Sequence, residues 1–118
     1  RYLLLDEPTT MISGHIAHQL LETVQRLARE QGIAVVHITH FMHEVTAFKR
    51  VIVMHAGQVL MDSTPASVFA RADELRAVGL DVPMVTRLGH HLRTRDWTGL
   101  PEVVLSIEDL KAGLCSSN

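Results

Sequence analysis

Two continuous apolar segments, separated by a stretch of helical length, constrain this chain most. The first is residues 2–5, which end at Asp6, and the second is residues 33–39. Unbroken hydrophobicity without alternation is typical of strands buried on both faces of a parallel sheet. Across residues 15–30 the apolar positions recur at helical spacing, and Gly32 follows where a helix C-cap is expected. The sequence therefore predicts a right-handed strand–helix–strand unit with parallel strands.

Shorter elements follow this unit. Residues 41–48 are long enough for a short helix, and residues 50–54 form a third apolar strand. Residues 58–62 are expected to pair with that strand as a hairpin on the edge of the same sheet. Beyond Pro65 the pattern becomes helical, and residues 93–101 are the best candidate for a linker.

The last helix has a clear start signal, because Ser106 and Asp109 have the spacing of a capping box, with Asp in place of Glu. The expected fold class is therefore α/β, with a partial parallel sheet, flanking helices and a C-terminal helical extension. We expect two parts, residues 1–64 and residues 65–118.

Composition excludes several classes of protein. The chain is 47% hydrophobic and 20% charged, which is ordinary for a soluble domain. Its formal net charge of −2 gives no reason to expect a nucleic-acid partner. A single cysteine excludes an intrachain disulfide framework, and no apolar run approaches the ~20 residues that cross a bilayer. The first residue is Arg1 and a buried-type strand starts at once, so we expect that further sequence precedes it.

Two adjacent carboxylates, Asp6 and Glu7, stand at the carboxyl end of the first strand, where open α/β sheets place their ligand sites. A divalent cation bound to a polyphosphate would explain them, since unpaired buried charge is costly. Asp6 could hold Mg²⁺ through its water shell, and Glu7 could polarise a water molecule for attack on a phosphate. The alternative is that Asp6 only caps the turn and Glu7 is solvated.

Three segments in order resemble the ATPase domain of ABC transporters, which has a P-loop NTPase-like fold. Residues 3–10, Leu-Leu-Leu-Asp-Glu-Pro-Thr-Thr, resemble the Walker B strand and its extension into the D-loop. Residues 35–44, Val-Val-His-Ile-Thr-His-Phe-Met-His-Glu, are similar to the switch segment, and residues 50–65 resemble the strands that follow. Ordered matches across most of the chain are more specific than any one motif.

The resemblance implies a role for each matching residue. Asp6 matches the Mg²⁺-coordinating aspartate, Glu7 the general base, and His40 the histidine that contacts the γ-phosphate of ATP. Residues 11–13, Met11, Ile12 and Ser13, fall on the D-loop, which in the family reaches across a dimer interface. Ser13 departs from the usual aspartate, which puts the strength of coupling between subunits in doubt.

The tail narrows the resemblance further. Residues 65–69 and 74–83 resemble the C-terminal extension of energy-coupling-factor and cobalt-importer ATP-binding subunits. These subunits use ATP and Mg²⁺ to drive import of vitamins or metal ions. The resemblance implies two kinds of partner, a second ATPase subunit in a homo- or heterodimer and transmembrane transporter subunits, and a location on the cytoplasmic face of the membrane.

The eight histidines also suggest a transition-metal site, but their spacing is weak for one. His15 and His18 share a helix face, whereas His37 and His40 should lie on opposite faces of a strand-like segment. A metal site built from them is therefore the weaker interpretation.

The phosphate-binding loop G-x-x-x-x-G-K-[ST] does not occur in the 118 residues, nor does the LSGGQ signature. We therefore expect the parent protein to be an ATPase and this chain alone to be inactive, with an exposed strand edge and apolar face. Two other hypotheses are a stand-alone interaction module on an ATPase remnant, and a different P-loop or flavodoxin-like protein with an acidic strand end.

Overall fold

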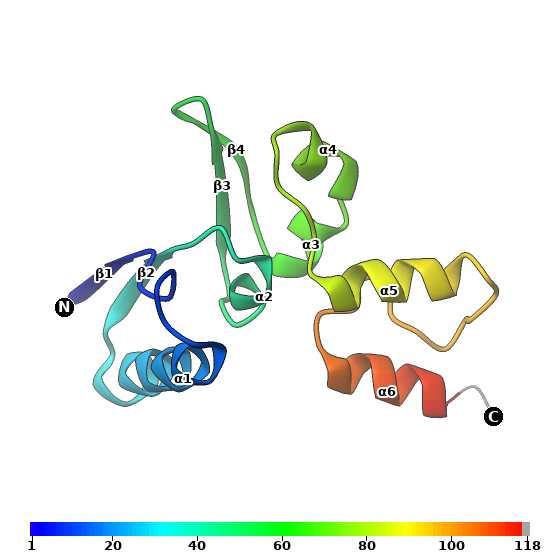
Figure 1. The fold of residues 1–118 in the computed structure, drawn as a ribbon, viewed down its shortest axis with the longest axis horizontal. Coiled ribbons are helices and arrows are strands. Elements are labelled where there is room, and N and C mark those ends of the chain that lie inside the picture. Colours follow the sequence, from blue (N-terminus) through cyan, green and yellow to red (C-terminus); the bar gives the residue numbers. More distant parts are fainter. Residues whose placement is uncertain (117–118) are drawn as a thin grey trace. The chain divides into compact units, whose positions relative to one another are not determined.

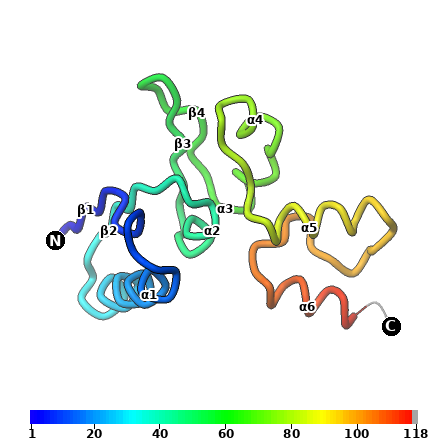
Figure 2. The backbone as a smooth tube through the Cα atoms, in the orientation of Figure 1, coloured from blue at the N-terminus to red at the C-terminus, as the bar shows by residue number. Residues whose placement is uncertain are grey.

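The computed structural model describes residues 1–116, whose contacts form two compact units. The first unit is Arg1–Glu44, and the second begins at Val45. The tube in Figure 2 follows the path of the chain through each unit. These contacts divide the chain before the β-hairpin. The sequence-based division separates the part that resembles the ATPase core, residues 1–64, from the C-terminal extension, residues 65–118, and it stays a prediction.

The first unit contains the predicted strand–helix–strand arrangement (Figure 1). Strand β1 (Tyr2–Asp6) leads through α1 (Gly14–Gln31) into β2 (Ala34–Ile38), and the two strands pair in parallel. Helix α2 (Met42–Val45) begins soon after β2. The α/β class and the parallel pairing are therefore confirmed, and the carboxyl ends of both strands meet at one edge.

The two faces of this small sheet differ in burial. The pairs Tyr2–Ala34, Leu4–Val36 and Asp6–Ile38 share one face, and this face is exposed: Tyr2 is 89% and Leu4 67% accessible. The opposite face is partly covered, because α1 packs beside β2. In this chain α1 covers one face only, so β1 is not buried on both faces, and the expected exposed apolar face is confirmed.

Both ends of α1 follow from local sequence. Ser13 adopts the extended conformation of an N-cap residue, and its carbonyl accepts the Ala17 amide at 2.9 Å. At the other end Gly32 has φ +61°, the left-handed conformation that glycine adopts without steric cost. Ala17 and Val24 are the helix residues that become fully buried. The helix predicted over residues 15–30 and its glycine C-cap are confirmed.

The second unit begins with an antiparallel hairpin of β3 (Val51–His55) and β4 (Gln58–Ser63). Its turn residues Ala56 and Gly57 both have positive φ, +49° and +77°, as a two-residue turn that matches strand twist requires. The hairpin forms a sheet of its own, so the prediction that it lies on the edge of the first sheet is wrong. Apolar pattern identifies strands but does not fix which sheet they join.

Four helices complete the second unit: α3 (Pro65–Phe69), α4 (Ala72–Ala77), α5 (Met84–Arg93) and α6 (Ile107–Cys115). The helical extension is therefore confirmed. The capping box of α6 is present, because the Ser106 hydroxyl accepts from the Asp109 amide at 3.0 Å and the Asp109 carboxylate accepts from the Ser106 amide at 3.1 Å. In residues 1–116, no helix has both the length and the apolar character that a membrane span needs.

The core of the second unit is apolar and closely packed. Its buried hydrophobic residues are Val53, Met61, Val68, Phe69, Leu75, Val82, Leu100 and Val104. Two helix glycines permit this packing, since a Cβ on Gly89 would overlap the Val104 side chain and a Cβ on Gly113 would overlap Leu100. Because these two positions carry no side chain, helices α5 and α6 can pack directly against the loop between them.

Candidate active site

Glu7 directly follows β1 and turns the chain away from the sheet. Its φ of +44° is in the left-handed region, which non-glycine residues rarely adopt. The Glu7 amide donates to the Ile38 carbonyl at 2.9 Å, so the main chain at Glu7 is fixed to the end of β2. The Thr10 hydroxyl donates to Glu7 Oε2 at 3.2 Å. A strained conformation held by neighbours is a feature that clusters at functional sites.

His40, just beyond β2, contacts Glu7 directly. Its Nδ1 lies 3.0 Å from Glu7 Oε1, and both side chains are about half exposed, at 52% and 46%. Because an ionised carboxylate can only accept, Nδ1 is the donor. This hydrogen bond, with a further one from Thr10, holds the pKa of Glu7 below its usual 4.5 despite some desolvation. The structure therefore brings together two of the predicted site residues that are 33 positions apart.

Asp6 is the last residue of β1 and lies opposite Ile38 on the exposed face of the sheet. It is adjacent to Glu7 in sequence, but strand alternation and the turn at Glu7 direct the two carboxylates differently. Within residues 1–116 no group of three His, Cys, Asp or Glu side chains could enclose a metal ion. One exposed carboxylate does suit Mg²⁺, which keeps most of its water and is otherwise held by substrate phosphates.

The predicted D-loop residues lie between Glu7 and α1. Met11 is 93% and Ile12 40% exposed, and Ser13 is also exposed. The Ser13 side chain makes no capping hydrogen bond to α1. Two exposed apolar side chains beside a free hydroxyl could meet a second subunit, and the assignment to an interface remains a prediction.

Sequence reasoning missed a buried pair next to this site. His37 Nε2 lies 2.9 Å from Glu44 Oε2, and each side chain is only 1% exposed. The sequence suggests His37 only as a weak candidate metal ligand, and it gives Glu44 only as part of the segment that resembles the switch. A signal was available, since His37 alternates with exposed Val36 and Ile38 along β2 and so faces the covered side.

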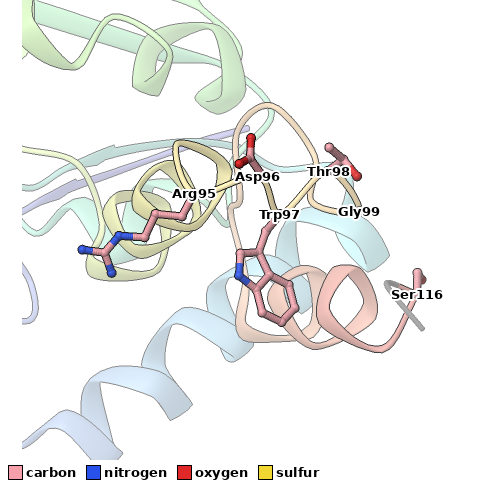
Figure 3. Close-up of a pocket in the computed structure, with 6 residues that line it drawn as sticks. All are labelled: Arg95, Asp96, Trp97, Thr98, Gly99 and Ser116. Atoms are coloured by element: carbon pink, nitrogen blue, oxygen red, sulfur yellow. The ribbon is translucent and has the colours of Figure 1, made fainter.

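A separate hollow of about 360 Å³ lies on the second unit, on the loop between α5 and α6. Figure 3 shows the side chains that line it, which are Arg95, Asp96, Trp97, Thr98, Gly99 and Ser116. The Arg95 guanidinium points away from the Trp97 indole, so the charged and aromatic groups do not converge on a ligand position. None of the predicted site residues lines this hollow.

Comparison with known proteins relates the whole strand–helix–strand unit and the extension to one group. The chain is 42% identical over 113 residues to the energy-coupling factor transporter ATP-binding protein EcfA1 of Caldanaerobacter subterraneus subsp. tengcongensis, covering 96% of the chain and 40% of the relative. The EcfA1 protein of Symbiobacterium thermophilum is 43% identical, with 96% and 39% covered. The EcfA2 protein of Bacillus cereus is 34% identical over 109 residues, with 92% and 37% covered.

The chain thus spans about two fifths of the length of the curated relatives that it matches. No protein-family model matches it.

Proposed function

Because this chain belongs to the energy-coupling factor transporter ATP-binding proteins, we propose that it is the catalytic-carboxylate portion of an ATPase that drives import. The observation that carries the proposal is the 3.0 Å contact between Glu7 Oε1 and His40 Nδ1 at the carboxyl ends of two paired parallel strands. Open α/β sheets bind their ligands at this edge. The substrate is Mg-ATP, and the transported solute is a vitamin or a metal ion.

Glu7 is the residue that orients the attacking water. Phosphoryl transfer passes through a loose transition state, so positioning of the water matters more than its full deprotonation. A carboxylate with a lowered pKa is a weak base but a permanent hydrogen-bond acceptor near neutral pH. Glu7 therefore accepts a hydrogen bond from the attacking water, and it does not take up the proton of that water before the attack.

His40 connects Glu7 to the terminal phosphate. Its Nδ1 donates to Glu7, so its Nε2 can donate to a phosphate oxygen only when the ring is the imidazolium ion. In that form the ring places a positive charge between two anions, which stabilises charge on the phosphoryl group. Asp6 would hold Mg²⁺ through water, and the ion would supply charge neutralisation at the phosphates.

Nucleotide binding needs parts that this chain does not contain, since the phosphate-binding loop is absent from its 118 residues. We propose that the chain alone neither binds ATP tightly nor hydrolyses it. Exposed Met11, Ile12 and Ser13 contact a second ATPase subunit. The assembly acts with transmembrane subunits at the cytoplasmic face of the membrane.

Complementation tests this proposal. The part of the Caldanaerobacter relative outside the matched stretch is supplied as a separate polypeptide, and Mg-ATP binding and phosphate release are measured with and without it. Activity in the mixture but in neither component supports the proposal. A mixture that forms a complex yet binds no nucleotide would instead favour a stand-alone interaction module.

The matched control for a substitution of Glu7 in this assay is Glu22→Gln. Glu22 is an exposed carboxylate on α1 that pairs with His18 at 3.3 Å, so the variant also breaks a histidine–carboxylate pair in the same unit. In the complemented assembly, the hydrolysis rate of this variant should equal that of the unaltered chain.

A further inference from the structure

Glu44, on α2, is the one carboxylate among residues 1–116 that is fully buried. Its side chain and that of His37 are each 1% exposed, and their atoms Oε2 and Nε2 are 2.9 Å apart. A buried charge without partners costs several kcal/mol, so such a residue persists only where other groups compensate it. The structure gives one compensating partner directly, which is His37 on β2.

The pKa of Glu44 agrees with this compensation. Burial alone would raise the pKa of Glu44, but hydrogen bonding from Thr9, His37 and Thr39 outweighs burial and the pKa lies below 4.5. The Thr9 hydroxyl is buried, and it makes no hydrogen bond of regular geometry within residues 1–116. The Thr39 oxygen also accepts the Phe41 amide at 3.0 Å, so its proton is available to the carboxylate.

The positions of these three residues connect Glu44 to the proposed chemistry. Thr9 is two residues after Glu7, on the turn that leaves β1. Thr39 directly precedes His40, and His37 belongs to β2. The Glu44 side chain is therefore held directly to β2, three residues before His40.

We propose that Glu44 is a positioning residue that, through its 2.9 Å contact with His37, fixes the turn between β2 and α2 on which His40 lies, and so keeps His40 in contact with Glu7. Glu44 does not itself touch the reacting groups. Its geometric role is independent of ATP hydrolysis, whereas its effect on the rate rests on the proposed function.

The test uses Glu44→Gln, which keeps the shape of the side chain and removes its charge. Long-range ¹H–¹⁵N NMR of the 118-residue chain reports which nitrogen of each imidazole carries the proton. In the unaltered chain we expect the proton on Nδ1 of His40, because the Glu7 carboxylate oxygen lies 3.0 Å from it and can only accept. In Glu44→Gln we expect His40 to average between tautomers while the α1 amide signals stay in place. A folded variant with His40 still protonated at Nδ1 alone would overturn the proposal.

Two further variants keep the result interpretable. Glu22→Gln, on exposed α1, should leave the His40 signals unchanged. Should Glu44→Gln unfold, His37→Gln replaces the imidazole that holds the Glu44 carboxylate with a flexible amide donor. The contact is loosened while the carboxylate keeps a donor, so loss of a single His40 tautomer is expected there too. An unaltered His40 in that folded variant would equally refute the positioning role.

Kinetics in the complemented assembly gives a second readout. A displacement of catalytic groups by about 1 Å costs up to roughly 100-fold in rate, so Glu44→Gln should lower kcat by about 10- to 100-fold with KM for ATP nearly unchanged. An equal rise in KM with constant kcat would mean that Glu44 supports binding only. If the assembly has no ATPase activity but the His40 tautomer responds, the positioning role stands and the proposed function fails.

Discussion

Thr9 and Glu44 are among the fully buried side chains of the first unit, whereas the second unit buries residues such as Val68, Leu75 and Val104. The surface of the first unit instead exposes apolar side chains. Tyr2, Leu4 and their neighbours on β2 leave one face of the sheet uncovered. Burial of polar groups around a histidine–carboxylate pair suits chemistry, and burial of closely packed apolar groups suits stability. The buried polar groups and the closely packed apolar core therefore lie in different parts of this chain.

The largest expected effect comes from Glu7→Gln in the complemented assembly. The amide cannot accept from the water as a carboxylate does, so we expect hydrolysis to fall by about 10²- to 10⁴-fold with ATP binding retained. Phosphate release and nucleotide titration measure the two quantities. Hydrolysis at the unaltered rate would show that the first unit does not carry the chemistry.

Leu75→Ala tests the other half of the comparison. Leu75 is completely buried in the second unit, so its truncation should lower the free energy of unfolding by about 2–5 kcal/mol. The matched variant Leu4→Ala removes a side chain that is 67% exposed, and should change stability by less than about 0.5 kcal/mol. Urea unfolding followed by circular dichroism measures the free energy of unfolding of both variants. Equal decreases would contradict the conclusion that the apolar core of the second unit carries the stability.

Gly89→Ala sharpens the comparison at the level of one methyl group. The new Cβ would lie 2.8 Å from Val104 Cβ and still closer to Cγ2, an overlap that should cost about 1–3 kcal/mol. In the first unit a Cβ on Gly14 meets nothing within 4 Å, so Gly14→Ala should stabilise by about 0.4–1 kcal/mol. Thermal melts of both variants give the signs.

The smallest effect is the acid response of the first unit. Glu44 has a lowered pKa in the folded chain, so its contribution to stability is present above pH 4.5 and is lost as the pH falls through the folded value. Stability measured against pH should decrease below about pH 4.5, and Glu44→Gln should flatten that decrease. An unchanged slope in the variant would show that other carboxylates control acid unfolding.

Sequence alone predicted β1, α1, β2 and the approach of Glu7 to His40, because these depend on local periodicity and on where parallel strands end. It did not predict that β3 and β4 form their own sheet, since strand pairing depends on contacts far apart in sequence. Hydrophobicity likewise predicted that residues 2–5 favour burial, but not which groups would provide the cover. The burial of Glu44 was not predicted, because a charged residue is seldom fully buried and a helix of one turn has no periodicity that could indicate it.

The turn between β3 and β4 offers a position at which the second unit could be stabilised. Ala56 adopts φ +49°, although asparagine is the residue that such turns prefer beside a glycine. An alanine there strains the main chain, and Ala56→Asn would relieve the strain without touching β1, β2 or α2. Stabilising substitutions are thus best placed in the second unit, which carries no proposed chemistry. The sheet edge with Glu7 and His40 then keeps its sequence.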